Sequence, residues 1–299
     1  MAVARTFTLP QPLDVGSTLR PLSHGRFDPT MRIETGWAWR ATRTPCGPAA
    51  LELRWWGDRL EARAFGAGAD WALDAVPDLL GFDDEARGFA PAHPVVRDLH
   101  RRRPGLRLGR SGAVLEALVP AIVEQRVQSA EAARSWVRLV RRFGEPAPGP
   151  AGLRLPPAPE QLAQLPYFAF HPCGIERRRA DTVRRAAAVA TRLERAVTLP
   201  LEQATRLLLA VPGVGPWTAA EVARDALGDR DAVSVGDWNL PHLVAWALAG
   251  ERRADDARML ELLEPFRPHR ARVVRLLTTS GLHPPRRAPR AALRSFAEC

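Results

Sequence analysis

The sequence predicts an α+β fold in which a small N-terminal antiparallel sheet domain precedes a two-lobed, all-helical domain. Up to about residue 65, apolar and polar residues alternate with the period of strands that bury one face. From residue 113 onward, apolar residues recur at helical spacing. The stretch 145–159 is rich in proline and glycine, which predicts a loop between two helical lobes.

Strand character is strongest in residues 51–64, where apolar and charged residues alternate on both sides of a turn at 56–59. This pattern predicts a hairpin with one apolar face. Residues 32–40 suggest another strand. Helical spacing at residues 70–80 then predicts a helix on one face of the sheet, with Gly81 as its end.

The helical domain is predicted to begin with two helices between residues 113 and 143, each with one apolar stripe. Ser129 is placed to cap the N-terminus of the second helix, and Gly144 to stop it. A third, basic helix is predicted at residues 177–196, with most of its arginines on a solvated face.

Composition narrows the class of protein. The 299 residues allow one large or two modest domains, and 46% hydrophobic residues supply an ample core. A net charge of +10 fits a polyanionic partner, although it does not by itself identify one. No apolar run approaches membrane-spanning length. Three sparse cysteines and no charged-then-apolar leader predict a reduced protein of the cytoplasm. We also expect a monomer that associates with the nucleoid.

The most informative stretch is the turn from Val211 to Gly215, which lies between two helical runs. Glycine permits φ > 0 and close backbone approach, and Pro216 suits the first position of the following helix. Bare amides and the positive end of that helix dipole favour an anion such as a phosphate. Taken alone, however, such a turn is better explained as a glycine cap between two core helices.

Asp237, which follows Gly213 by 24 positions, favours the phosphate-binding interpretation of the turn over a simple cap. The run Gly213-Val214-Gly215-Pro216-Trp217-Thr218-Ala219 with this aspartate resembles the helix-hairpin-helix, glycine/proline-rich-loop and aspartate (HhH-GPD) superfamily of DNA base-excision glycosylases. Trp directly after the turn looks like the DNA-3-methyladenine glycosylase II branch, as does the segment 103–108. The resemblance covers most of residues 90–282. It implies that Asp237 is the catalytic carboxylate and that double-stranded DNA with damaged bases is the partner.

The same resemblance implies which residues contact DNA. By position, Arg126 corresponds to the side chain that wedges into the duplex, where relatives usually place an apolar residue; the alternative is contact with phosphate or solvent only. Backbone carbonyls of the hairpin in this family also bind a monovalent cation (Na⁺ or K⁺) when DNA is present; by position these belong to Leu209, Val211 and Val214. The implied DNA contacts are Gln125, Arg126, Pro212, Gly213, Val214, Gly215 and Thr218.

The chain contains no lysine, so all 43 residues in the Lys+Arg count are arginine. A glycosylase with lyase activity attacks the sugar with a lysine amine to form a Schiff base, and Trp217 occupies the position of that lysine in the superfamily's lyases. We therefore expect a monofunctional enzyme in which water is the nucleophile. The three cysteines, Cys46, Cys173 and Cys299, cannot supply the four thiolates of an iron–sulfur cluster, so no such cluster and no required cofactor is expected.

The resemblance also implies a pocket for the base. Trp217 is the natural partner for a cationic alkylated base, with Trp238 beside Asp237 as a further candidate; a lone tryptophan would more often be core. Glu221 lies one turn after Trp217, where relatives have an aromatic residue. It would either add negative charge to the pocket or pair with an arginine such as Arg224. His269 takes the place of a stacking aromatic.

These observations predict a monofunctional DNA glycosylase that flips out and hydrolyses alkylated purines of the 3-methyladenine and 7-methylguanine type in base excision repair. The alternatives are a glycosylase for oxidised or deaminated bases and a non-catalytic DNA-binding protein. The predicted domains are 1–95 for the sheet, 96–283 for the helical domain with its hairpin at 207–228, and 284–299 for a basic tail.

Overall fold

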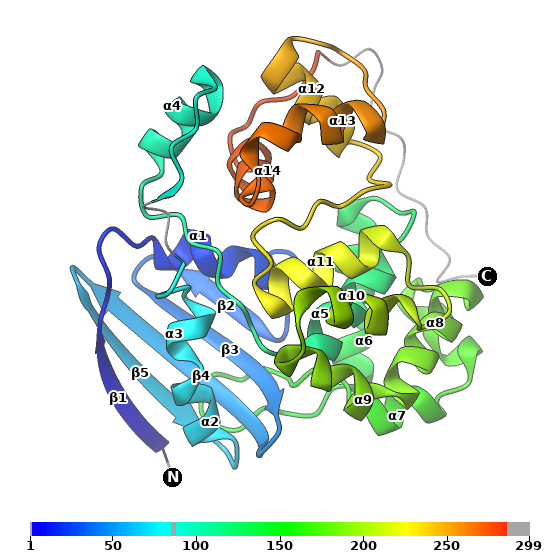
Figure 1. The fold of residues 1–299 in the computed structure, drawn as a ribbon. Coiled ribbons are helices and arrows are strands. Elements are labelled where there is room, and N and C mark those ends of the chain that lie inside the picture. The colour runs from blue at the N-terminus through cyan, green and yellow to red at the C-terminus, as the bar shows by residue number, and fades with distance from the viewer. Residues whose placement is uncertain (1, 85–87, 286–299) are drawn as a thin grey trace.

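A computed structural model gives the fold of residues 2–84 and 88–285 (Figure 1). The predicted basic tail, 284–299, lies outside the described residues except for its first two positions. None of the helices in the described part of the chain has both the length and the apolar character needed to cross a membrane. Three bodies pack together: the sheet, a group of helices around α5, and a second group that contains α12, α13 and α14.

The N-terminal sheet has five antiparallel strands in the order β1-β5-β4-β3-β2. Residues 32–40 form two paired strands rather than one, because the chain turns at Gly36, where φ is +81°. Strand β1 lies at the edge beside β5 and is mostly exposed, so its sequence carries little apolar alternation. The strands are β1 (Ala2–Thr8), β2 (Met31–Glu34), β3 (Trp37–Thr44), β4 (Gly47–Trp56) and β5 (Arg59–Phe65).

Short helices cover the sheet, and their apolar residues share one core with it. The predicted helix at 70–80 is two short helices, because Pro77 at the start of the second one interrupts the first. On the opposite face, Leu153 and Leu155 from the proline-rich stretch pack on Ala41. The sheet is therefore covered on both sides near β4. The covering helices are α1 (Val15–Leu19), η1 (Arg20–Leu22), α2 (Ala69–Asp74) and α3 (Val76–Leu79).

Helix α5 is the centre of the middle lobe, since eight of its eleven residues are buried. Two predictions here are corrected. Ser129 is the first residue of α6 rather than its cap, because Gln128 occupies the N-cap position. The predicted helix 177–196 breaks after Ala188. The elements are α5 (Val114–Glu124), α6 (Ser129–Phe143), α7 (Pro159–Gln164), η3 (Tyr167–Cys173), α8 (Arg177–Ala188), α9 (Ala190–Glu194), η4 (Arg195–Thr198), α10 (Leu201–Leu209) and α11 (Pro216–Leu227).

The third body joins segments from both ends of the helical domain. Helix α4 (Pro94–Arg102) packs against α14, and Phe89 contributes to the same core, several residues before the predicted start of that domain at 96. Arg272 of α14 forms a fully buried ion pair with Asp84, at 2.6 Å to one carboxylate oxygen. This pair ties the lobe to the loop after α3. The remaining elements are α12 (Leu240–Ala249), α13 (Asp256–Leu263), η5 (Glu264–Phe266) and α14 (Arg270–Thr278).

Candidate active site and nucleic-acid interface

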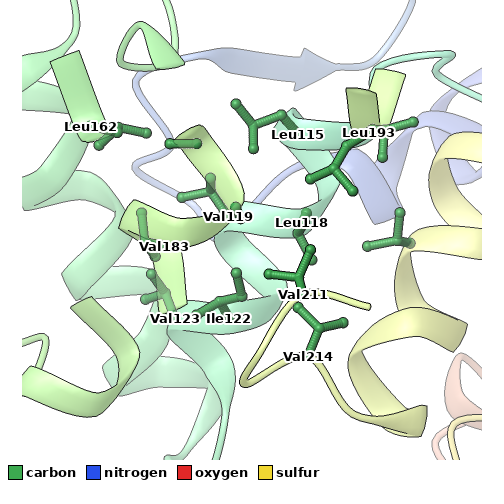
Figure 2. Close-up of a cluster of buried hydrophobic side chains, with 14 of the residues drawn as sticks. Leu115, Leu118, Val119, Ile122, Val123, Leu162, Val183, Leu193, Val211 and Val214 are labelled. Carbon is green, nitrogen blue, oxygen red and sulfur yellow. The ribbon is translucent and has the colours of Figure 1, made fainter. Parts of the chain in front are cut away.

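Helices α10 and α11 and the turn between them form a helix–hairpin–helix, as predicted. Val211 and Val214 project from the turn into the core beside Leu118 and Ile122 of α5 (Figure 2). The amide of Val214 donates to the carbonyl of Val211 at 2.9 Å and closes the turn. Because these two valines are buried, Pro212 and the neighbouring glycines are left on the surface. The turn is thus a rigid, solvent-facing backbone surface.

The two glycines of the hairpin serve different purposes. Gly213 has φ = +100°, and a Cβ there would collide with the side chain of Thr182 on α8. Gly215 has φ = −103°, so it does not use the left-handed region that its sequence context suggested. A Cβ on Gly215 would meet no atom within 4 Å. Gly213 therefore allows the turn to pack on α8, whereas Gly215, at the N-cap of α11, leaves open space at the positive end of a helix.

Gln125 joins the end of α5 to the hairpin. Its side-chain amide donates to the carbonyl of Gly213 at 3.0 Å and to the hydroxyl of Thr218 at 2.8 Å. Thr218 is only 2% exposed, so its side chain holds Gln125 and does not face the surface where DNA would lie. Arg185 of α8 reaches the carbonyl of Pro212 at 3.4 Å. The predicted wedge loop and the hairpin are consequently one connected unit.

Arg126 is exposed and follows Gln125 in the loop between α5 and α6. Within residues 2–84 and 88–285, it is the only residue other than glycine with a positive φ, at +59°. A side chain in this region of φ costs free energy that the surrounding structure must compensate, and such positions are concentrated at functional sites. The conformation displays Arg126 at the surface and is compatible with both interpretations, a wedge and a phosphate contact.

Asp237 meets Trp217 across the loop that follows α11. The indole Nε1 donates to Oδ2 of Asp237 at 3.1 Å. The other oxygen, Oδ1, accepts the amides of Asn239 and Leu240, both at 2.8 Å, where α12 begins. Although Asn239 holds the N-cap position of α12, Oδ1 of Asp237 binds the amides where this helix begins. Those bonds fix the carboxylate, and Oδ2 faces the tryptophan.

Residues around Asp237 hold its loop in place. Gly236 has φ = +94°, and its amide donates to both carboxylate oxygens of Asp256 at 3.1 Å. Trp238 is 84% exposed, so it is neither a core residue nor packed on Trp217. An exposed tryptophan next to the carboxylate of Asp237 is available to stack on a base.

Glu221 pairs with Arg224, which is the second of the two roles considered for it from the sequence. Its carboxylate binds Arg224 through two hydrogen bonds of 2.7 and 2.6 Å, and the hydroxyl of Ser234 also donates to it. His269 is half-buried beside the core of the third body, where its ring packs on Phe89 with 5.3 Å between centroids. Burial lowers the pKa of His269, and the charge of nearby Arg272 lowers it further.

The predicted cation ligands fit a hard cation in their chemistry, since all three are backbone carbonyl oxygens. The carbonyl of Val211 accepts one hydrogen bond from Val214, which leaves a lone pair for an ion. No group of three or more His, Cys, Asp or Glu side chains among the described residues is arranged to hold a metal ion. Cys46 is exposed in the sheet domain, while burial raises the pKa of the Cys173 thiol to about 11. The monovalent cation remains a prediction.

The family model of HhH-GPD superfamily base excision DNA repair proteins matches residues 119–268, half of the chain. This span includes the second half of α5, the hairpin, Trp217 and Asp237. The chain belongs to the HhH-GPD superfamily.

Individual relatives agree with this assignment. A probable bifunctional transcriptional activator/DNA repair enzyme AlkA of Mycobacterium tuberculosis is 32% identical over 220 residues, which are 71% of this chain and 41% of that protein. The DNA-3-methyladenine glycosylase 2 of Escherichia coli is 30% identical over 169 residues, or 56% of this chain and 58% of its own. The chain thus spans 41% of the length of the first relative and 58% of the second, less than two thirds of either. A 3-methyladenine DNA glycosylase from Archaeoglobus fulgidus has the same fold, with a TM-score of 0.79 and 20% identity over 93% and 99% of the two chains.

Two residues of the site carry no signal in the sequence. Asp256 lies 20 positions after Gly236, on another helix, and only the folded lobe brings them together. Glu124 precedes Gln125 and lines a cavity next to Glu221. It is one of two acids among nine apolar or small residues of α5, and nothing in the hairpin motif marks it.

Proposed function

We propose that this chain is a monofunctional DNA glycosylase that removes alkylated purines from double-stranded DNA. The observation that carries the proposal is the contact between Trp217 and Asp237. Base excision needs a carboxylate to stabilise the sugar, an aromatic ring to hold the base and a surface to bind the DNA backbone. The first two meet in this contact, and the hairpin supplies a backbone surface suited to phosphate. A non-catalytic DNA-binding protein would require the hairpin but neither of these two side chains.

The chemistry begins with extrusion of the nucleotide, because a stacked and paired base is out of reach of a side chain. In the proposed mechanism, the open surface at Gly215 and Pro216 holds a phosphate, while Arg126 contacts the duplex at the gap. The amides at the start of α11 supply the hydrogen bonds. The cost of extrusion is a few kcal/mol and is smaller for a damaged pair.

Cleavage of the N-glycosidic bond builds positive charge on the sugar. In Asp237, two amides hold Oδ1, and Oδ2 accepts one hydrogen bond from Trp217 and keeps a lone pair to stabilise that charge and to orient a water molecule. An alkylated purine is already cationic, so it leaves without strong acid catalysis, and the faces of Trp217 and Trp238 attract it. With no lysine in the chain, no side-chain amine is present to form a Schiff base with the sugar.

The test uses duplexes that each carry one 3-methyladenine, N7-methylguanine, hypoxanthine or 8-oxoguanine. We expect abasic product fastest from the two methylated bases and more slowly from hypoxanthine, with no strand cleavage and no covalent complex after borohydride reduction. Asp237→Asn should abolish the product, whereas Asp70→Asn, a surface change on α2, should not. Excision of 8-oxoguanine alone would support the alternative of an oxidised-base glycosylase. No product from any lesion would refute the enzymatic function.

A further inference from the structure

A cavity of about 150 Å³ lies between the sheet domain and helices α5, α11 and α14. A cavity of roughly this volume accommodates a benzene ring, so it is of the right order for the ring of a base. Its wall mixes apolar and charged side chains from all three bodies of the molecule. Among them are Met31, Pro120, Ala121, Trp136 and His24.

The cavity has an excess of negative charge. Four carboxylates line it, against three guanidinium groups. Three of the carboxylates are neutralised locally. Glu116 pairs with Arg40 at 3.0 Å, Glu221 pairs with Arg224 at 2.6 Å, and Asp225 pairs with the same Arg224 at 2.8 Å.

Glu124 is the fourth carboxylate, and it differs from the others. In the part of the chain that the structure describes, its side chain makes neither a hydrogen bond nor an ion pair, although its backbone carbonyl accepts the amide of Val127. It is the last residue of α5 and is partly buried. The unbalanced charge of the cavity is therefore that of Glu124.

The cavity adjoins the residues that would carry the reaction. Glu221 in its wall lies one turn after Trp217 on α11, so the two side chains share a face of the helix. Glu124, which also lines the cavity, is followed by Gln125, which binds Thr218 next to that tryptophan. Neither Trp217 nor Asp237 lines the cavity itself, so its link to the reacting groups runs through these neighbouring residues.

We propose that Glu124 makes this cavity selective for a positively charged base. The inference rests on the proposed function and adds the residue that discriminates between lesions. Methylation at N7 or N3 gives a purine a full positive charge, and an unpaired carboxylate in the cavity wall stabilises that charge. A neutral lesion gains no such stabilisation. Glu221 does not have this role, because two bonds from Arg224 and one from Ser234 already occupy its carboxylate.

The experiment compares single-turnover excision of N7-methylguanine, which is cationic, with excision of hypoxanthine, which is neutral. Glu124→Gln should reduce the ratio of the two rates about fivefold, the size of effect expected for one partly exposed charge pair. Glu124→Asp, which keeps the charge, should restore most of the ratio. Both lesions are cleaved by the same protein preparation, so any partial loss of folded protein cancels.

Two controls separate the cavity from other effects. Glu202→Gln, an exposed change at the start of α10, alters the net charge equally and should leave the ratio unchanged. A duplex with a cationic pyrrolidine in place of the target sugar probes charge at the sugar only, so Glu124→Gln should leave its affinity intact while Asp237→Asn weakens it. An unchanged ratio in Glu124→Gln, with the wild type active on N7-methylguanine, would overturn the role of Glu124 alone. An inactive wild type would overturn the proposed function as well.

Discussion

The hairpin and the loop that carries Asp237 meet at one site but are anchored by different forces. The hairpin is held by apolar burial, with Val211 and Val214 inserted against α5. The loop is held by hydrogen bonds, chiefly from Gly236 to Asp256 and from the start of α12 to Asp237. Removing buried apolar contacts lowers the free energy of unfolding. Removing a hydrogen bond from an exposed loop mainly displaces the side chain that the loop holds in place. Changes in the hairpin should therefore alter stability, and changes in the loop should alter rate.

The largest expected effect is on the loop side. Asp237→Asn should lower the single-turnover rate at least about 100-fold, since a charge placed for the transition state contributes about 3 kcal/mol. Asparagine also caps helices well, so α12 should persist and the Tm should change little. Quench-flow excision and thermal melting on the same preparation would check both. A large fall in Tm would mean that the aspartate is mainly structural.

The next effect is on the hairpin side. Gly213→Ala should lower the free energy of unfolding by about 2 kcal/mol, because alanine is strained at this φ and its Cβ would meet Thr182. Gly215→Ala is the matched control, with ordinary φ and open space, and should be nearly neutral in stability while weakening DNA binding. Urea unfolding would measure the first effect and fluorescence anisotropy the second. Equal destabilisation by the two changes would contradict the distinction between these glycines.

The contact between the two regions is tested by Trp217→Phe. The ring is kept, but the donor to Oδ2 of Asp237 is lost. A hydrogen bond to a charged group contributes about 1.5–3 kcal/mol, and part of this should appear as a rate lower by about tenfold with unchanged DNA affinity. Single-turnover kinetics at saturating enzyme would separate the two quantities. A fall in affinity alone would indicate that Trp217 binds DNA without acting on Asp237.

The smallest effect is expected for Asp256→Asn. The amide of Gly236 would keep one acceptor and lose the charge, so the loop should hold its position less firmly and the rate should fall about threefold, or ~0.6 kcal/mol, as for a weakened exposed hydrogen bond. The Tm should be unaffected. Asp255→Asn, which changes the neighbouring cap of α13, provides the comparison. If it slows excision as much as Asp256→Asn does, the effect comes from the helix and not from the loop.

Much of the site could be predicted because its residues lie close together in the sequence. The turn from Val211 to Gly215, the helix that begins at Pro216 and the aspartate 24 positions after Gly213 form a local pattern, and the structure has the two helices as predicted. Local patterns were also sufficient for the hairpin of β4 and β5. The roles of these residues in catalysis and DNA binding remain predictions until the experiments above are done.

Other features could not be predicted because they depend on contacts between distant segments. The prediction that Ser129 caps α6 was wrong because the helix begins at Ser129 itself, one residue earlier than a cap at this position would allow. Edge strand β1 is mostly exposed, so only its pairing with β5 defines it. His269 lies where a stacking aromatic was expected, yet its half-buried ring makes an edge contact with Phe89.

The sequence by itself determined the α+β class, the superfamily, the absence of lysine and the positions of Trp217 and Asp237, since each depends on residue identity or short spacing. Only the tertiary structure decided which carboxylates of the cavity are free. The sequence marks Glu221 by its place one turn after Trp217 and leaves two roles open for it, and it does not mark Glu124. Folding brings Arg224 and Ser234 to Glu221, and it brings neither a donor nor a cation from the described chain to Glu124. The charge that a ligand meets depends on such pairing, because a neutralised carboxylate attracts a cation far less than an unpaired one.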